Sequence, residues 1–413
     1  MSTLKTQESS AAPRKRRWTL SLRAMMVAVL LIGGGVAWWL YPVRSQRDAV
    51  AMLQRKGGQV VYNQKVGWTY GSTTHKPVPP AKSWVSEHLG QDFVDTTKTV
   101  QVHNHDFSDE DMVQIGRLDQ LEEISLSGTS ITDVGVAHLS GLKRLQFLEL
   151  SETQATGASL VHLRAMTEMK HLRLQKLPIA DADLAHLEGM TKLENLLIAS
   201  PQITDEGMKY LRGMTKLKWL DLSSAQVTSK GLENLRDMQS LFTLSLYATR
   251  VESIEPLRSL PNLGFLMLSK TPIDDAGLKA VETLTNLNGL HVSNTRITDE
   301  SLAYVRPLSV LKHLFVDGNP ITDAGLTHLE GHPGIQALSL DHTAITGKGL
   351  THLKDLRQPF QVWADHDDVT DADLTGLAAL KNCVEISVKG TKVTAAGIAA
   401  VKASLPPGMK INR

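Results

Sequence analysis

The stretch HLFVDGNPITDAGLTHL, from His313 to Leu329, decides the fold, because the chain repeats its pattern many times with other residues around it. The segments SGTSITDVGVAHL and SNTRITDESLAYV show the same arrangement elsewhere in the chain. A sequence that resembles itself at a fixed spacing is typical of stacked structural units, each of which contacts its neighbours. The spacing of these copies is therefore the first property to establish.

Each copy contains a short run of the LxL type, and the first apolar residue of that run recurs every 24 residues, apart from one interval of 22 residues. Such a long regular array predicts a solenoid, in which neighbouring units bury each other's apolar faces. The thirteen recurring residues are Val100, Ile124, Leu148, Leu172, Leu196, Leu220, Leu244, Leu266, Leu290, Leu314, Leu338, Val362 and Ile386.

Within a unit, the alternation of the LxL run has the period of a strand, whereas Leu326 and Leu329 have the three-residue spacing of a helix. We expect the recurring Thr before Asp to cap each helix and the Asp to interact with the helix dipole. These pairs are Thr132 and Asp133, Thr204 and Asp205, Thr298 and Asp299, Thr322 and Asp323, and Thr370 and Asp371. A Thr or Asn five residues after the central apolar residue, as at Thr295 and Asn319, predicts a ladder of turn hydrogen bonds.

The repeated phrase LxxLxLxxTxITDxGLxxL resembles the leucine-rich repeats of ribonuclease-inhibitor-like and bacterial proteins over about three quarters of the chain. The resemblance implies an α/β fold, a horseshoe-shaped solenoid or right-handed superhelix with a parallel β-sheet on its concave face. We place the repeats at residues 98–402 and a carboxyl-terminal end or cap at 403–413.

The amino-terminal region carries a different signal. Residues 1–23 form a basic tail, and residues 24–43 contain no charge over a length of roughly 30 Å, enough to cross a bilayer as one helix. The basic flank predicts a signal anchor with the repeats on the extracytoplasmic (periplasmic) side. A cleaved signal peptide and a buried core helix are the alternatives. Residues 44–97, with an amphipathic helix at 45–56, a strand at 59–63 and a short helix near Trp84, are predicted to cap the solenoid.

Composition limits the function. Residues 1–47 have a net charge of +7 within a total of +1, so the remainder is mildly acidic, unlike a nucleic-acid-binding domain. The single cysteine, Cys383, lies at an inward Leu position and is interpreted as a core residue. No phosphate-binding loop, GxSxG or HExxH motif is present, which argues against an enzyme and against a cofactor.

Two further features of the repeat array are interpreted as structural. The short unit that begins at Leu244 contains Pro256 and Pro261 in place of the usual helix, which favours a tighter 3₁₀ connection. A stripe of histidines occupies one helix position, and because that position recurs with the repeat, duplication explains the stripe better than metal binding does. Its members are His138, His162, His186, His328 and His352.

The concave face is the candidate binding surface, because solenoids use this extended surface for recognition. Aromatic and imidazole side chains at its exposed positions are candidate anchors for a partner. Asp317, Asp341 and Asp365 share one strand position in successive units and form a weak candidate for a cation site. The full candidate set is Trp219, Tyr247, Phe265, His291, His313, Phe315, Asp317, Asp341, His342, Trp363, Asp365 and His366.

These observations favour a membrane-anchored binding or scaffold protein of the bacterial cell envelope, whose partner is a protein or an envelope glycan and not a nucleic acid. A structural element that associates with itself is the second hypothesis. A cytoplasm-facing adaptor, as in F-box-associated repeats, is the third, although no F-box-like segment is present.

Overall fold

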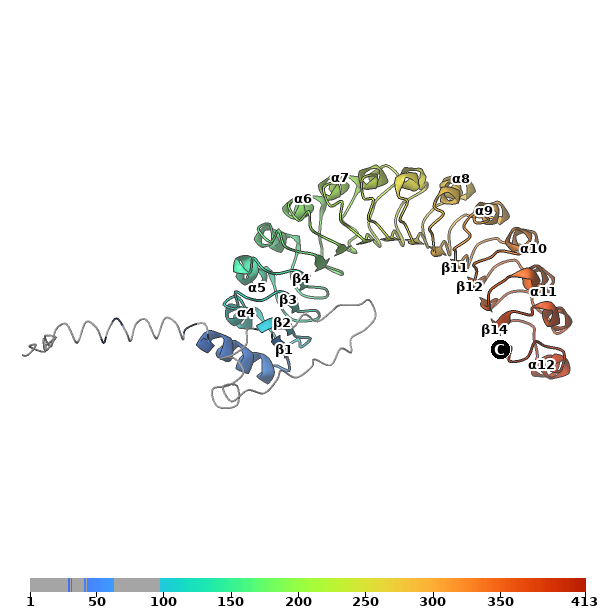
Figure 1. Ribbon diagram of the computed structural model, residues 1–413, viewed down its shortest axis with the longest axis horizontal. Coiled ribbons are helices and arrows are strands. Elements are labelled where there is room, and N and C mark those ends of the chain that lie inside the picture. Colours follow the sequence, from blue (N-terminus) through green and yellow to red (C-terminus); the bar gives the residue numbers. More distant parts are fainter. Residues whose placement is uncertain (1–28, 30, 32–40, 42, 63–96) are drawn as a thin grey trace, which may run out of the picture.

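The computed structural model describes residues 29, 31, 41, 43–62 and 97–413, and Figure 1 shows them as an arc. Most of the membrane-spanning segment predicted at 24–43 and the short helix predicted near Trp84 lie outside the described residues. Among the residues that the structure does describe, no helix is long and apolar enough to cross a bilayer.

One continuous sheet of 15 strands, in sequence order, lines the inner edge of the arc (Figure 1). Strands β2 to β15 are parallel, and the central residues of neighbouring units pair in register, as Leu290 does with Leu314. The strands are β1 Gln59–Tyr62, β2 Thr97–Gln101, β3 Glu123–Ser125, β4 Phe147–Glu149, β5 His171–Arg173, β6 Asn195–Leu197, β7 Trp219–Asp221, β8 Thr243–Ser245, β9 Phe265–Met267, β10 Gly289–His291, β11 His313–Phe315, β12 Ala337–Ser339, β13 Phe360–Trp363, β14 Cys383–Ser387 and β15 Lys410–Asn412.

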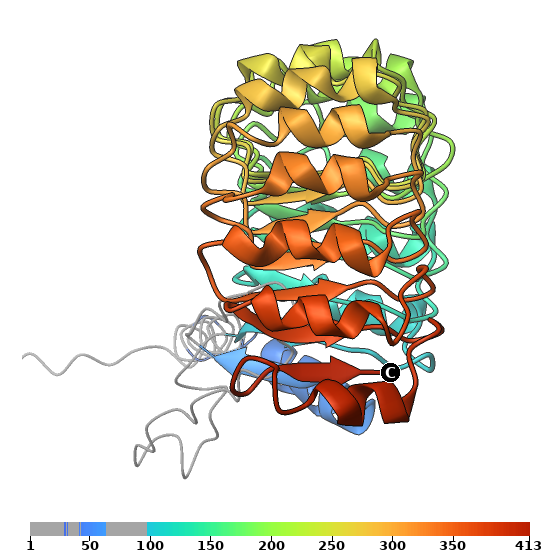
Figure 2. The same cartoon turned by 90° about the vertical axis from the view of Figure 1, so that its right-hand side faces the viewer.

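Short helices cover the outer edge of the arc, and Figure 2 shows them as one layer beside the strands. The α-helical turns are α4 Asp109–Ile115, α5 Asp133–Ala137, α6 Asp181–Leu184, α7 Asp205–Met208, α8 Asp275–Leu278, α9 Asp299–Tyr304, α10 Asp323–Leu326, α11 Gly347–Leu350 and α12 Ala395–Val401. The 3₁₀ turns are η1 His138–Gly141, η2 Gly157–His162, η3 Ala185–Leu187, η4 Lys209–Leu211, η5 Gly231–Leu235, η6 Glu255–Ser259, η7 Lys279–Thr283, η8 Thr327–Leu329, η9 Thr351–Asp355 and η10 Asp373–Ala379.

A single apolar core runs the length of the solenoid between the sheet and the helices. The central strand residues, such as Leu290 and Leu314, and the helix residues, such as Leu326, are fully buried. Cys383 belongs to this core with 3% of its surface exposed, as its inward position predicted. The period of the sequence therefore corresponds to a layer of packing in each unit.

The first unit is closed by the chain that precedes it. Residues 43–55 are helical, and Ala49 and Leu53 of this helix are buried in the common core. Strand β1 then pairs with β2 in the antiparallel direction, unlike every other strand pair of the sheet. Lys56 fastens the segment, since its ammonium group donates to the carbonyl of Asp106 at 2.7 Å.

Neighbouring units are joined by hydrogen bonds between an Asp of one unit and a Thr of the next, a contact that we call the clasp. The sequence predicted only that the Asp interacts with the dipole of its own helix, and this contact between units was not predicted. The Asp299 carboxylate accepts hydrogen bonds from the backbone N–H of Thr322 at 2.7 Å and from its hydroxyl at 2.6 Å. Thr322 also caps α10, as predicted, by accepting from the N–H of Ala324. A methyl group at Gly325 would overlap the Asp299 carboxylate, so the Gly of the motif makes room for the preceding unit. The TDxG motif is thus a contact between units.

At two positions where the Asp of the clasp is replaced by Gly, the next unit supplies a carboxylate instead. Gly347 replaces the clasp Asp, and Asp373 of the following unit folds into the space that Gly347 leaves open. Its carboxylate accepts from the N–H of Thr370 at 2.9 Å and from the hydroxyl at 2.7 Å. The prediction that Thr370 caps a helix is therefore wrong, because its hydroxyl binds Asp373 and η10 begins two residues after Asp371. The pair Gly157 and Asp183 repeats this exchange.

A ladder of turn hydrogen bonds also links the units, as predicted. In six units a Thr hydroxyl donates to the carbonyl three residues earlier, as Thr271 does to Leu268 at 2.6 Å. Asn319 reaches further, because its amide donates to the carbonyls of Val316 and of Val292 in the preceding unit, each at 2.8 Å. The polar residue at this position therefore ties each strand exit to the backbone around it.

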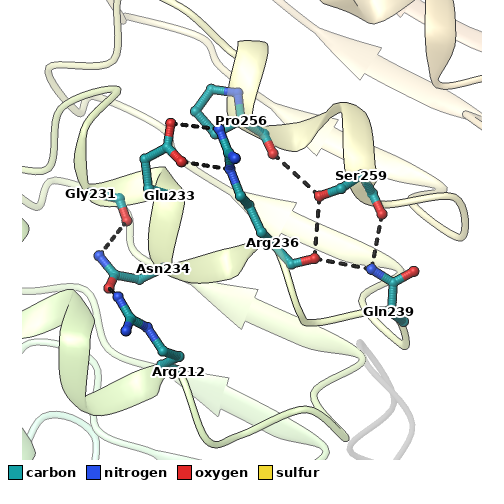
Figure 3. Close-up of polar contacts among 8 residues, drawn as sticks. All are labelled: Arg212, Gly231, Glu233, Asn234, Arg236, Gln239, Pro256 and Ser259. Carbon is teal, nitrogen blue, oxygen red and sulfur yellow. Dashed lines mark hydrogen bonds and ion pairs between the residues drawn. The ribbon is translucent and has the colours of Figure 1, made fainter.

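The unit from Leu244 to Leu266 is two residues shorter than the others, and Figure 3 shows the polar contacts between its helical turn and that of the preceding unit. The 3₁₀ connection predicted there is present as η6, with Pro256 in its first turn, although 3₁₀ turns also occur in many full-length units. Gln239 donates to the carbonyls of Arg236 and Ser259, each at 3.0 Å, and so joins η5 to η6. Arg236 is held in turn by Glu233 at 2.8 Å. The bonds of Gln239 therefore tie the shortened unit to the unit before it.

Candidate functional site

The candidate site lies on the concave face, where the residues on either side of each central apolar residue point away from the core. In β11, Leu314 is buried, whereas His313 and Phe315 are half-buried on the opposite face. The same alternation exposes Phe265 in β9, His291 in β10 and Trp363 in β13. We call these five residues, Phe265, His291, His313, Phe315 and Trp363, the aromatic patch.

The rings of the aromatic patch contact one another along two rows. In one row, His291 and Phe315 stack with ring centroids 4.4 Å apart, and Phe315 meets Trp363 edge-on at 6.4 Å. In the other row, Phe265 and His313 stack at 6.4 Å. Aromatic pairs at these separations attract one another beyond the area that they bury. Each row is therefore continuous, and the two rows lie on the same face of β9 to β13.

Small residues allow rings on alternate strands to meet. Gly289 lies between Phe265 and His313 in the strand register, and a Cβ there would overlap the Phe265 ring. Ser339 lies in the same way between Phe315 and Trp363. Because adjacent strands are about 4.8 Å apart, larger residues at these two positions would fill the space between the rings.

The patch is uncharged at neutral pH. Burial lowers the pKa of His291, and the neighbouring His313 lowers it further. Burial also lowers the pKa of His313, with a smaller effect of Lys312. Both shifts favour the neutral imidazole, so the two histidines contribute aromatic rings to the patch.

Trp219 and Tyr247, the other two aromatic candidates, lie further toward the amino terminus. Trp219 in β7 is half-buried, and Thr243 of β8 lies between it and Phe265 in the strand register. Tyr247 follows β8, is 37% exposed and holds the ammonium group of Lys270 at 5.1 Å from its ring centre. They extend the concave face beyond the aromatic patch.

The three successive aspartates form a structural ladder. Asp317 accepts from the hydroxyl of Ser293 at 2.6 Å, Asp341 from the backbone N–H of Asp365 at 2.8 Å, and Asp365 from the N–H of Lys389 at 2.7 Å. Burial raises the pKa of Asp341. Within the described ranges, no group of three acidic, His or Cys residues is arranged to hold a metal ion, and this includes the weak cation-site candidates Asp317, Asp341 and Asp365. Each carboxylate instead bonds protein groups of its neighbours.

His342 and His366 lie beside this ladder at the strand exits. Their rings are stacked in parallel, with centroids 4.4 Å apart and an interplanar angle of 4°. Both residues have a positive φ, 57° and 64°, which is uncommon for residues other than Gly. Both side chains are exposed, so the pair presents one flat face at the edge of the concave surface.

A groove beside the patch was missed by the sequence analysis. A hollow of about 670 Å³ runs along the edge where the strands begin, and Phe242, Val310, Lys312 and Gln336 line part of it. Phe242 is 45% exposed and Val310 41% exposed, unusual values for large apolar side chains. The Phe242 ring meets Phe265 edge-on at 5.6 Å, so the groove adjoins the aromatic patch. The signal in the sequence is that Val310 stands where other units have polar residues or Gly, and that Phe242 stands where most units have a polar residue.

The amino-terminal part of the concave face has a different character. Arg173 lies 3.8 Å from Glu149, and its guanidinium also covers the Phe147 ring at 5.4 Å. Lys98 and Glu122 are paired at 2.8 Å. Charged groups there bond their neighbours within the sheet, whereas the carboxyl-terminal part presents neutral rings.

Comparisons with known proteins agree with this architecture. A family model described as a leucine-rich repeat matches residues 213–235. An internalin from Listeria monocytogenes is similar in structure, with 25% sequence identity, a TM-score of 0.58, and coverage of 73% of this chain and 82% of that chain. A leucine-rich-repeat protein from Leptospira interrogans shares the fold at 17% identity and a TM-score of 0.51, with 73% and 92% of the two chains covered. No curated protein sequence matches. The chain carries a leucine-rich-repeat solenoid.

Proposed function

We propose that this protein is a membrane-anchored receptor or scaffold that binds another protein through the carboxyl-terminal part of its concave face. The observation that carries the proposal is the aromatic patch, in which neutral rings in mutual contact remain half-exposed on the surface that solenoids use for recognition. Aromatic side chains are enriched among the residues that dominate binding energy at protein interfaces. We therefore assign the patch as the centre of the interface.

The borders of the patch resemble the polar rim of a protein interface. The groove with Phe242 and Lys312 adjoins one side, and the histidine pair with the aspartate ladder lies at the strand exits. An interface of this kind combines an apolar centre with a hydrogen-bonding rim. The leucine-rich-repeat solenoid supports a binding role, because solenoids use their concave surface for recognition. We accordingly propose no catalytic activity and no cofactor.

The membrane anchor is a separate proposal, supported by the uncharged run at 24–43 and the basic residues that precede it. It places the repeats on the extracytoplasmic side. Protease added to intact cells and to spheroplasts tests the topology. Digestion of the repeats only after the outer barrier is opened is the expected result, and protection in intact spheroplasts would overturn it.

Affinity capture with the full-length chain tests the binding role. Two concave variants, Phe315→Ala and Trp363→Ala, are compared with Tyr304→Ala, which removes an aromatic side chain from the outer helix α9. We expect a protein retained by the wild type and by the Tyr304 variant, and lost by at least tenfold from both concave variants. Equal retention by all variants would show that the patch is not the interface, and retention of a glycan alone would show that the partner class is wrong.

A further inference from the structure

The position that Asn319 occupies in the turn ladder shows what a side chain there must do. Its amide oxygen accepts from the backbone N–H of Thr295 at 2.9 Å and from the Thr295 hydroxyl at 3.0 Å. Its amide nitrogen donates to the carbonyls of Val292 and Val316. Asn319 therefore supplies an acceptor on one side of its position and a donor on the other.

Asp367 stands at the same position two units later, and the carboxylate atoms divide in the same way. Oδ1 accepts from the N–H of Thr343 at 2.7 Å and from the Thr343 hydroxyl at 3.3 Å, as the Asn319 oxygen does in its unit. Oδ2 is buried, and within the described part of the chain it has no hydrogen-bond partner. The residue is only 5% exposed.

The carbonyls at this site are also without donors. Leu340 and Ala364 correspond by the repeat to Val292 and Val316, and both are fully buried. Among the hydrogen bonds formed by residues 43–62 and 97–413, none is donated to the oxygen of Leu340 or of Ala364. If Asp367 were ionised, its Oδ2 and the two carbonyl oxygens would be three buried acceptors without a donor. At the equivalent position two units earlier, the amide of Asn319 supplies that donor. Buried polar groups without partners are rare in native proteins, because each costs about 1–3 kcal/mol.

We propose that Asp367 is a neutral carboxylic acid in the folded protein, with its proton on Oδ2 donated to the backbone carbonyl of Leu340 or Ala364. One proton then supplies the donor that the amide supplies at Asn319. The ladder tolerates an acid at this position only in its protonated form.

Burial and the neighbouring carboxylates also favour the protonated form of Asp367. Burial, and then the nearby Asp341 and Asp317, raise its pKa to about 7, in spite of the hydrogen bonds from Thr343. The other titratable or charged groups in the adjoining turns are His342 in the preceding unit, Asp365, His366 and Asp368 in its own, and Lys389 and Lys392 in the next. Lys392 is paired with Asp368 at 2.6 Å.

The proposal makes the carboxyl-terminal end of the solenoid sensitive to pH. Because the folded acid holds its proton more tightly than the unfolded one, its contribution is greatest below about pH 4 and falls as the pH rises to about 7. Asp367 follows β13 in the unit that carries Trp363, so mild acid tightens the turn beside the aromatic patch. That last consequence for binding rests on the proposed function, whereas the protonation itself does not.

Chemical unfolding of the full-length chain between pH 4 and pH 9 tests the proposal. The Asp367→Asn variant keeps the donor at every pH, so the ratio of the wild-type to the variant unfolding constant should rise about tenfold per pH unit up to about pH 7, then level off. Asn319→Asp should acquire the same slope at its own position. Asp368→Asn, an exposed neighbour, should show no such slope.

A direct measurement separates protonation from its effect on stability. Carboxyl ¹³C labelling of Asp, assigned by difference from the Asp367→Asn variant, should reveal one resonance in its protonated position at pH 5.5 that titrates near pH 7. A resonance already ionised at pH 5.5, or a stability ratio that does not change with pH, would overturn the proposal. Neither measurement uses a binding partner, so failure of the proposed function leaves both outcomes readable.

Discussion

The clasp between neighbouring units predicts that two damaging substitutions will repair each other. Gly347→Asp places a carboxylate where Asp373 already lies, and Asp373→Gly removes the carboxylate that serves Thr370. Together, however, the two changes restore the common arrangement, in which the Asp of one unit bonds the Thr of the next. The contact of Asp299 with Thr322 is the pattern for that arrangement.

The magnitudes follow from the contacts. Asp373→Gly removes two hydrogen bonds to a charged group, at 2.9 and 2.7 Å from Thr370, and should cost about 2 kcal/mol. Gly347→Asp forces two carboxylates into the space of one and should cost about 3 kcal/mol. Independent effects would sum to about 5 kcal/mol. We expect the double variant to lie within about 1 kcal/mol of the wild type.

Urea unfolding of the four full-length proteins, followed by circular dichroism, measures the coupling. The reciprocal exchange, Asp323→Gly with Gly349→Asp, is the matched control, because it converts a common clasp into the exchanged form. Restoration is expected in both pairs. A double variant that loses the full sum of the single losses would refute the idea that a single carboxylate position is shared between the units.

Three further predictions concern the core and the surface. Leu290→Ala opens a cavity in a fully buried layer and should lower the free energy of unfolding by about 3 kcal/mol in urea titrations, and a loss below about 1 kcal/mol would contradict the packing. Cys383 should resist thiol reagents at pH 8 until the chain unfolds, because burial raises its pKa to about 12; rapid labelling of the native protein would count against this. Lys392→Gln breaks only an exposed pair with Asp368, so the urea midpoint should not move measurably, and a clear shift would mean that the pair is buried.

The sequence predicted the architecture because its period is long and almost unbroken. Each central apolar residue, from Val100 to Ile386, lies in a strand and pairs in register with the next. The clasp was not predicted, because the local argument for Asp299 used the dipole of its own helix, whereas its carboxylate bonds Thr322 of the next unit. A repeating pattern identifies which face of an element is buried, but not which atoms meet across units.

The candidate site was predictable only in part for a related reason. Strand alternation placed His313, Phe315 and Trp363 on the concave face, and they lie there. That Phe315 and Trp363 would touch depends on the small Ser339 between them, which is a property of three strands together. The sequence showed Asp317, Asp341 and Asp365 only as three like charges at one strand position. Their hydrogen bonds to neighbouring units cannot be derived from the sequence of one strand.

The residues that depart from the repeat are of two kinds: some are compensated by a second change in a neighbouring unit, and others are not. Asp373 departs from the motif, but Gly347 departs with it in the preceding unit, and the carboxylate ends in hydrogen bonds inside the protein. Such paired departures preserve the scaffold. Phe315 and Trp363 also depart from the small or polar residues found at their position in several units, yet their rings remain half-exposed and contact only each other and His291 among the rings of the patch. Among the described residues, the ring partners of Phe315 and Trp363 belong to the same half-exposed patch, which supports the proposal that a partner binds there.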